Sequence, residues 1–359
     1  MRTAAALQFH LQCKIGEEGE SSGITRNAPY NAWIVQEPNG PFQSTELNLP
    51  SLAPGQVLVR IAASGLNPLD TKIRAGQAAH ARQPLPAVLG LDMAGTVVET
   101  ASGVTAFHEG DEVYGLVGGV GGHQGTLAEY ITVNADLLAL KPRNLSMRQA
   151  AALPLSTITA WEGLVDRAQV HAGQTVLIHA GAGGVGHIAL QIALAYGARV
   201  FATVSSDKQK IVEDYGATPI DYRSSSVEQY GAEYTAGQGF DIVYDTVGGA
   251  TLDVTFAAVK RYTGHALSCL GWGSHSLAPL SFRGATYSGV FTLHPLLTGE
   301  NQLHHGHILA QATSLAEAGK LKPLLNPQSF ACNHFESAFA TVSAGSLGKV
   351  VTELQSPKS

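Results

Sequence analysis

Short apolar runs separated by glycine and proline characterise the chain from Ala32 to Pro142. No strong helical period interrupts them. Turn residues between short runs of alternating or continuous apolar positions are typical of antiparallel strands. This part of the chain is therefore predicted to be a compact, mostly antiparallel β module, with candidate strands at 57–63, 94–98, 112–114 and 127–133.

From Ser146 onward the pattern changes to strands that alternate with helices. Ser146-Met-Arg-Gln has the spacing of a capping box and predicts the start of a short helix. A second helix is predicted over 156–168. Alternation of this kind predicts a parallel, doubly wound sheet. Its strands are expected at 175–180, 199–204, 241–245 and 265–270, with helices after the first three.

The C-terminal part of the pattern contributes to both modules. Residues 286–293 are a further strand candidate near the sheet edge, and 307–318 are predicted to be helical. Residues 348–353 look like a strand that returns to the first module. The first domain is therefore expected to be discontinuous, with the α/β unit inserted into it.

These patterns predict the domain boundaries. The β domain is expected to comprise residues 30–153 and 300–359, and the doubly wound domain residues 154–299. Residues 1–29 are interpreted as an N-terminal extension, because they contain a short apolar start and acidic residues but no sustained apolar stretch of a secretory signal.

A glycine-rich turn follows the predicted strand Thr175–Ala180. Gly181-x-Gly183-x-x-Gly186 is followed by apolar residues at helical spacing. The missing side chains let backbone N–H groups approach a pyrophosphate, and the helix dipole favours its negative charge. The turn is therefore predicted to bind a dinucleotide, with a purely packing βα turn as the alternative; the predicted contacts are Ala180, Gly181, Gly183, Gly184, Val185 and Gly186.

The end of the second strand of this sheet favours NADP(H) over NAD(H). An NAD enzyme usually has an acidic residue about 20 residues past the glycine turn. Here the strand ends in Ser205, Asp207 comes late, and Lys208 and then Tyr222 follow. Hydroxyls and cations suit a 2′-phosphate, which a strand-end carboxylate would repel. An ordinary solvated helix start with surface lysines is the alternative.

Composition mainly excludes other classes of protein. The net charge of −6 argues against nucleic-acid binding, and no run reaches the ~18 apolar residues that a membrane helix requires. The three cysteines, Cys13, Cys269 and Cys332, are odd in number and far apart along the chain, so their spacing predicts neither a disulfide framework nor a zinc-binding Cys-x-x-Cys lobe. A cytoplasmic location is therefore expected.

Several motifs together resemble the medium-chain dehydrogenase/reductase superfamily, specifically its zinc-independent quinone oxidoreductase branch. The resemblance runs from about Ala32 to Glu353 and rests on residues 64–70, 89–95, 125–130, 153–154, 159–160, 179–186, 244–249 and 348–351. It implies a GroES-like, mostly antiparallel β domain that encloses an inserted Rossmann domain with a doubly wound parallel sheet. It also implies an active site between the two domains and a homodimer formed through edge strands.

The resemblance assigns roles to individual residues. Asp245, Val247 and Gly248 would lie on the nicotinamide side of the cofactor, and Thr159 near its phosphates or nicotinamide. Ser205, Lys208 and Tyr222 occupy the family's 2′-phosphate positions, in agreement with the charge argument.

The resemblance also bears on zinc. Zinc alcohol dehydrogenases have a cysteine near the position of Asn67 and a histidine where this chain has Leu91. Leucine cannot ligate a metal, and no four closely spaced cysteines are present, so neither a catalytic nor a structural zinc is expected. The histidines of 304–307 lack an accompanying carboxylate or cysteine and are predicted to be surface or interface residues.

Without a Lewis acid, the easiest substrates are already electron-poor. A quinone or α,β-unsaturated carbonyl accepts hydride at a conjugated position, and the site then needs a hydrogen-bond donor for the developing oxyanion. Asn67 is the best donor by position, although turn formation before Pro68 would explain it equally well. His80 stands where related enoyl-thioester reductases have a tyrosine, and is either a general acid or an ordinary loop residue.

The sequence thus predicts an NADPH-dependent quinone or enone reductase acting on a small molecule, with no nucleic-acid or membrane partner. An enoyl-thioester or haloacrylate reductase is the alternative among enzymes. An NADP(H)-binding structural or sensor protein without turnover is the alternative from another class.

Overall fold

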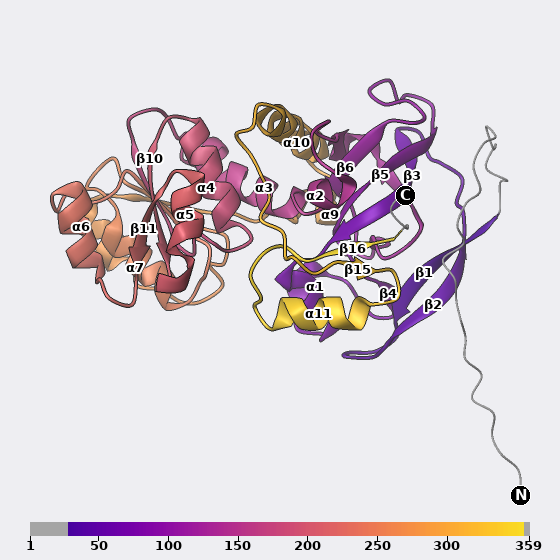
Figure 1. Cartoon of the computed structure of the whole chain (residues 1–359), viewed down its shortest axis with the longest axis horizontal. Coiled ribbons are helices and arrows are strands. Elements are labelled where there is room, and N and C mark those ends of the chain that lie inside the picture. Colours follow the sequence, from indigo (N-terminus) through magenta and orange to yellow (C-terminus); the bar gives the residue numbers. More distant parts are fainter. Residues whose placement is uncertain (1–27, 355–359) are drawn as a thin grey trace, which may run out of the picture.

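The computed structural model describes residues 28–354, which form two parts with separate β-sheets (Figure 1). The predicted N-terminal extension therefore lies almost entirely outside the described residues. The α/β part, with α4 to α7 around β10 and β11, occupies the left of Figure 1, and the antiparallel part occupies the right.

The antiparallel part is built on a seven-stranded sheet. Its strands follow the order β15-β16-β3-β5-β6-β8, and β7 pairs with β3. A three-stranded sheet with the order β2-β1-β4 lies beside it. The predicted, mostly antiparallel module is confirmed; its strands are β1 (Pro29–Val35), β2 (Phe42–Asn48), β3 (Gln56–Gly65), β4 (Ala87–Val88), β5 (Asp92–Thr100), β6 (Glu112–Leu116), β7 (Tyr130–Asn134), β8 (Leu138–Leu140), β15 (Phe330–Ala331) and β16 (Val351–Glu353).

The α/β part contains a six-stranded sheet in which every neighbouring pair is parallel. The order β11-β10-β9-β12-β13-β14 is the strand order of a Rossmann fold. The predicted doubly wound sheet is therefore confirmed. Its strands are β9 (Thr175–Ile178), β10 (Arg199–Val204), β11 (Thr218–Asp221), β12 (Ile242–Asp245), β13 (His265–Ser268) and β14 (Thr286–Gly289).

Helices cover both faces of the parallel sheet, and others pack on the antiparallel part. In chain order, the helices of the described residues are α1 (Pro68–Arg74), η1 (Ala79–Ala81), η2 (Ala135–Leu137), α2 (Met147–Ala151), α3 (Pro154–Trp161), η3 (Glu162–Arg167), α4 (Gly186–Ala195), η4 (Ser206–Lys208), α5 (Gln209–Tyr215), α6 (Val227–Thr235), α7 (Ala250–Ala258), α8 (Ala278–Arg283), α9 (His294–Thr298), α10 (Gln302–Glu317) and α11 (Phe335–Ser343). The capping box at Ser146 is confirmed, because its side chain accepts from the backbone N–H of Gln149.

Several predicted elements have different bounds; for example, the helix expected over 307–318 is α10, which begins at Gln302 and ends at Glu317. The helix expected over 156–168 begins at Pro154, where proline is tolerated at the first helical turn, and continues from Glu162 as the π-helix η3. The strand expected over 286–293 ends at Gly289, and α9 begins soon after it. The strand does form the sheet edge, as predicted.

The glycine cluster 118–125 is followed by the apolar run 126–133, a pattern that predicts a β-hairpin loop; this prediction is wrong. The loop joins β6 to β7, but β6 pairs with β5 and β8, whereas β7 pairs with β3. The glycines allow close backbone contacts instead of a hairpin turn. A Cβ atom on Gly118 would lie 2.0 Å from the carbonyl oxygen of Gln124, and one on Gly125 would lie 2.2 Å from that of Leu89.

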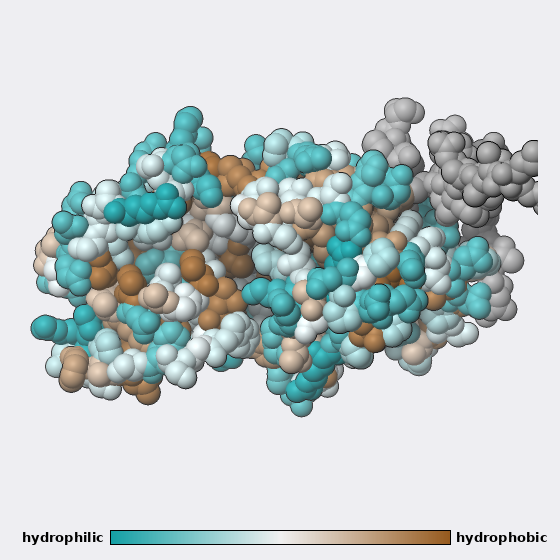
Figure 2. All heavy atoms as spheres, turned by 90° about the horizontal axis from the view of Figure 1, so that it is seen from below, coloured by the Kyte–Doolittle hydropathy of each residue, from teal (hydrophilic) through white to brown (hydrophobic). Residues whose placement is uncertain are grey.

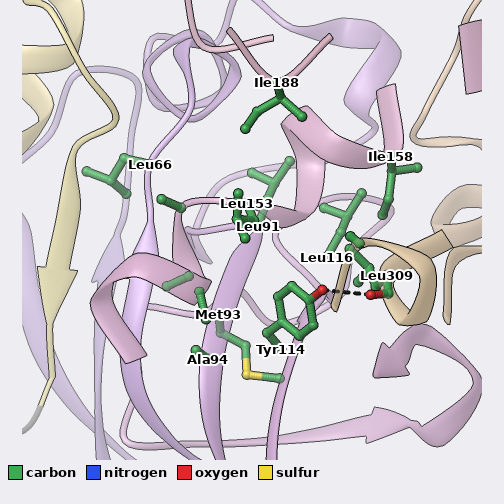
Figure 3. Close-up of a cluster of buried hydrophobic side chains, with 14 of the residues drawn as sticks. Leu66, Leu91, Met93, Ala94, Tyr114, Leu116, Leu153, Ile158, Ile188 and Leu309 are labelled. Atoms are coloured by element: carbon green, nitrogen blue, oxygen red, sulfur yellow. Dashed lines mark hydrogen bonds between the residues drawn. The ribbon is translucent and has the colours of Figure 1, made fainter. Parts of the chain in front are cut away.

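The main hydrophobic core is continuous between the two parts. Leu91 and Tyr114 of the antiparallel part lie in one buried cluster with Ile188 of α4 and Leu309 of α10 (Figure 3). The hydroxyl of Tyr114 donates to the carbonyl of Leu309 over 2.7 Å (Figure 3). A second cluster fills the opposite face of the parallel sheet. This shared core holds the cleft between the two parts in a defined geometry.

Candidate cofactor cleft and active site

A cleft of about 770 Å³ lies where the antiparallel part meets the C-terminal ends of the parallel strands. The glycine turn, the end of β10 and the segment 345–350 all line it. Figure 2 shows apolar residues gathered on one face of the molecule, where the surface is hollowed between the left-hand part and the rest. Sequential strand order reverses at β9, between β10 and β12, and ligands of open α/β sheets bind at such a switch point.

The glycine turn divides its residues between packing and ligand approach. A Cβ on Gly181 would lie 2.4 Å from the Cβ of Ala202, and one on Gly186 would lie 1.9 Å from the carbonyl oxygen of Ala180. These two glycines let the turn and α4 pack against β9 and β10. Gly183 and Gly184 instead line the cleft. The packing interpretation therefore applies to Gly181 and Gly186, whereas Gly183 and Gly184 lie where the predicted cofactor contact requires them.

The residues predicted for the 2′-phosphate lie along the cleft. Ser205 follows β10, Lys208 ends η4, Tyr222 follows β11, and all three line the cleft. Asp207 does not line it, and a hydrogen bond with Ser205 lowers the pKa of its carboxyl group. This end of the cleft thus presents a cation and two hydroxyl groups, which suit a phosphate.

The residues predicted for the nicotinamide side occupy different positions. Asp245 is fully buried, and its carboxylate accepts from the backbone N–H groups of Val247 and Gly248 over 3.0 and 2.9 Å. It therefore shapes the turn after β12, from which Val247 lines the cleft. Thr159 is buried and shares a 2.6 Å hydrogen bond with the hydroxyl of Thr292.

Asn67 lies in a buried polar network. Its side-chain nitrogen donates to Asp92 over 3.0 Å, and its side-chain oxygen accepts from the ammonium of Lys349. Its backbone N–H donates to the carboxylate of Asp70 over 2.8 Å, which caps α1. Asn67 itself is 3% exposed, whereas its neighbours Leu66 and Pro68 line the cleft. The residue therefore forms the turn and also lies beneath the cleft.

Burial sets the charge states around this network. It raises the pKa of Asp70 to about 8 and that of Asp92 to about 6. Burial lowers the pKa of Lys349, and the nearby carboxylates oppose that shift. Asp92 also accepts from the backbone N–H of Leu155, which helps to stabilise its ionised form. The network thus places the buried Lys349 side chain next to two carboxyl groups whose pKa values are raised by burial.

His80 does not line the cleft. Its ring centroid lies 5.0 Å from that of Trp272 and 6.4 Å from that of Phe291, so it belongs to an aromatic cluster. Burial, followed by the charge of Lys72, lowers the pKa of His80. Its role as a general acid stays a prediction.

The histidines of α10 differ from one another. His304 lies 2.6 Å from the carboxylate of Asp166, near the surface. His305 is 1% exposed and lies 3.4 Å from the carboxylate of Glu162. The prediction of a surface or interface residue is wrong for His305, because the packing of α10 on α3 and η3 buries this side of the helix.

Among the cleft-lining residues that were not predicted from the sequence are Lys349 and His179. Lys349 lies within the motif 348–351, which indicated the family but gave no sign of where its side chain points. His179 directly follows β9, lines the cleft and shares a 3.2 Å hydrogen bond with Thr203. Burial lowers the pKa of His179 to about 4, so its imidazole is neutral at pH 7. A histidine directly before the glycine turn was the only available signal for it.

Comparison with known proteins places this architecture in a family. The family model of the alcohol dehydrogenase GroES-like domain matches residues 53–143, and that of zinc-binding dehydrogenases matches residues 184–301. The chain is 36% identical over 332 residues to an NADPH-dependent alkenal/one oxidoreductase of Arabidopsis thaliana. The match covers 89% of this chain and 78% of the relative. It is also 36% identical to a 2-methylene-furan-3-one reductase of Solanum lycopersicum, over 84% of this chain and 73% of the relative.

Solved structures agree with these matches. An alcohol dehydrogenase superfamily protein from Novosphingobium aromaticivorans has a TM-score of 0.89 and 58% identity, and the match covers 91% of this chain and 100% of that one. The quinone oxidoreductase from Coxiella burnetii has a TM-score of 0.74 and 26% identity, over 91% of this chain and 100% of that one.

The fold and the cleft define a two-domain dinucleotide-dependent dehydrogenase/reductase. The chain belongs to the medium-chain dehydrogenase/reductase superfamily, and it is an NAD(P)H oxidoreductase whose cofactor is NADP(H). Within residues 28–354 no helix is long and apolar enough to span a membrane. The same residues contain no group of three or more His, Cys, Asp or Glu side chains that could hold a metal ion, although one matching family model is named for zinc binding.

The cation at the 2′-phosphate end can be tested by substitution. Lys208→Ala is expected to weaken NADPH binding by about tenfold or more, because a charge-assisted hydrogen bond contributes roughly 1.5–3 kcal/mol. NADH binding should be unchanged, since NADH lacks the 2′-phosphate. Fluorescence titration of both cofactors measures the effect. Lys210→Ala is the matched control, since Lys210 is an exposed neighbour paired with Asp214; equal losses for NADPH and NADH would contradict the assignment.

Asp70 predicts a pH dependence of stability. Its folded-state pKa of about 8 lies above the usual value, so its protonated form stabilises the fold at low pH, and this contribution is lost as the pH rises through about 8. Asp70→Asn keeps an oxygen that accepts from the N–H of Asn67. The wild type should therefore lose stability relative to the variant as the pH rises from 5 to 8. The urea midpoint of the variant, measured relative to that of the wild type, should be higher at pH 8 than at pH 5. A constant difference would contradict the raised pKa.

Proposed function

We propose that this chain is an NADPH-dependent, zinc-independent reductase that transfers hydride to a quinone or an α,β-unsaturated carbonyl compound. The observation that carries the proposal is a single cleft that combines phosphate-binding groups with a buried amide network. The phosphate-binding groups are Ser205, Lys208 and Tyr222, and the amide network lies beneath Leu66 and Pro68. The names of the plant relatives, an alkenal/one oxidoreductase and a methylene-furanone reductase, support the same class of acceptor.

The cofactor supplies the hydride from its nicotinamide ring when bound, and the chain must stabilise the negative charge that develops on the acceptor oxygen. Asn67 is the proposed donor. Lys349 holds its side-chain oxygen and Asp92 accepts one of its two N–H bonds, which fixes the amide in one orientation. The second N–H has no acceptor among the described residues. A hydrogen bond from an ammonium to the amide oxygen also makes the amide N–H a stronger donor, because the amide is polarised.

A panel of acceptors tests the proposed reaction. NADPH oxidation is expected with small quinones and enones, and to a lesser extent with enoyl thioesters or haloacrylates. Asn67→Ala should lower kcat by about 100-fold, as for the loss of an oxyanion donor, while NADPH affinity falls much less. Asn333→Ala, at an exposed position, is the control. Dialysis against a chelator should leave the rate unchanged.

Different outcomes of the panel point to different functions. NADPH binding without oxidation by any acceptor would identify a structural or sensor protein. Faster turnover of an enoyl thioester or a haloacrylate than of every quinone and enone would favour the alternative enzymes. Loss of activity on dialysis, restored by zinc, would overturn the zinc-independent mechanism.

We also propose a homodimer in the cytoplasm. β14 forms one edge of the parallel sheet, and an unpaired strand edge is a template for pairing with a second chain. Phe282 and Tyr287 beside this edge are exposed, which supports an interface there. Light scattering is expected to give twice the mass of the chain. Tyr287→Pro should shift it toward the monomer, because Thr286 and Val290 direct their N–H groups to β13 and the N–H of Tyr287 therefore faces the free edge, where proline removes it. A monomeric wild type would contradict the proposal.

A further inference from the structure

Lys349 is a buried cation with an unusual set of partners. It follows Gly348, just before β16, and is 5% exposed. Its ammonium donates to the side-chain oxygen of Asn67, which is the one hydrogen-bond acceptor that the described side chains provide. An ammonium has three donors. Two of its N–H bonds are therefore left without a protein acceptor among residues 28–354.

The backbone holds this side chain firmly in place. The N–H of Lys349 donates to the carbonyl of Leu324 over 2.8 Å, and its carbonyl accepts from the N–H of Asn326 over 2.9 Å. The Lys349 side chain therefore leaves a backbone that is hydrogen-bonded on both sides. Its direction is fixed by the fold before any ligand binds.

The ammonium lies against the glycine turn. A Cβ atom on Gly184 would be 3.8 Å from the Nζ atom of Lys349 and 3.8 Å from the hydroxyl oxygen of Ser156. Gly184 and Lys349 both line the cleft. A residue of the antiparallel part thus places a positive charge beside the backbone N–H groups that the Rossmann part offers to a pyrophosphate.

The charge of Lys349 is not neutralised by a direct ion pair. Within residues 28–354 no carboxylate forms a salt bridge with it, and the amide of Asn67 separates it from Asp92. A buried cation is costly unless it is paired and hydrogen-bonded. A cation that serves only the fold would be expected to contact Asp92 directly. The arrangement instead leaves the ammonium available to an anion that enters the cleft.

We propose that Lys349 is a cofactor-binding residue whose ammonium donates to the diphosphate of NADP(H), on its nicotinamide side, while it holds the amide of Asn67. The adenosine end of the cleft is already assigned to Ser205, Lys208 and Tyr222, whereas Lys349 lies with Asn67 on the side of the antiparallel part. The inference rests on the NADPH-dependent part of the proposed function and does not depend on the acceptor.

Equilibrium titration of NADPH fluorescence tests the proposal. Lys349→Met is expected to weaken NADPH binding by about 10- to 100-fold, the range of a charge-assisted hydrogen bond. Lys349→Arg should restore part of the affinity, since it keeps the charge. The salt dependence of the dissociation constant should decrease in the methionine variant only. Lys320→Met, at an exposed position, is the control and should bind like the wild type. Unchanged NADPH affinity in Lys349→Met would overturn the proposal.

A cofactor fragment locates the contact. Adenosine 2′,5′-bisphosphate carries the adenosine end of the cofactor but lacks the nicotinamide side. Lys349→Met should bind this fragment as tightly as the wild type does. Equal losses for the fragment and for NADPH would overturn the proposed contact, because they would indicate a general disturbance of the cleft.

A second variant separates ligand binding from the cost of an unpaired buried carboxylate. The double variant Lys349→Met with Asp92→Asn removes both charges, so it should fold even if the single variant does not, and far-UV circular dichroism monitors this. NADPH binding should remain weak in the double variant. Recovery of wild-type affinity would show that the single substitution acted through the stranded carboxylate and would overturn the inference. A wild type that binds NADPH but reduces no acceptor would contradict the proposed function and leave this inference intact.

Discussion

The contact of the glycine turn with its own strand is the constraint on which the cleft depends. The α carbon of Gly186 lies so close to the carbonyl of Ala180 that a Cβ atom would overlap it. This contact lets α4 begin at Gly186, directly after the turn that follows β9, so that Gly183, Gly184 and His187 line the cleft. Any side chain at this position would move the helix away from the strand. This movement of α4 would also separate Gly184 from Lys349 and disrupt the cleft surface that the two parts share.

The two parts contribute different chemistry to that surface. The parallel sheet supplies backbone donors and the groups suited to a 2′-phosphate, all within one contiguous stretch of strand ends. The antiparallel part supplies a buried amide and a buried ammonium, held by carboxyl groups whose pKa values burial raises. Because the hydrophobic core is continuous between the parts, these groups are positioned before a ligand arrives. Such preorganisation suits hydride transfer to an acceptor that is already electron-poor, since the site mainly has to hold and polarise it.

The roles of Asn67 show how one residue can satisfy two interpretations. The residue caps α1 and forms the turn before Pro68, as the Asn-Pro sequence favours. Its side chain also joins Asp92 to Lys349, which no local pattern indicates. His80 is a contrasting case. It lies in an aromatic cluster with Trp272 and Phe291 and is not among the residues that line the cleft, so the geometry gives no support to a role in proton transfer.

The sequence by itself determined the local elements and the turn. Alternating apolar runs, the capping box at Ser146 and the spacing of Gly181, Gly183 and Gly186 depend on residues that are neighbours along the chain. These elements and the glycine turn could therefore be predicted from the spacing of residues along the chain. The tertiary structure decided the contacts between distant segments: the pairing of β6 and β7 with other strands, the burial of His305 and the approach of Lys349 to Asn67. Lys349 and Asn67 are separated by 282 positions, and only the folding of the C-terminal strand back onto the first sheet brings a lysine to the floor of a dinucleotide cleft.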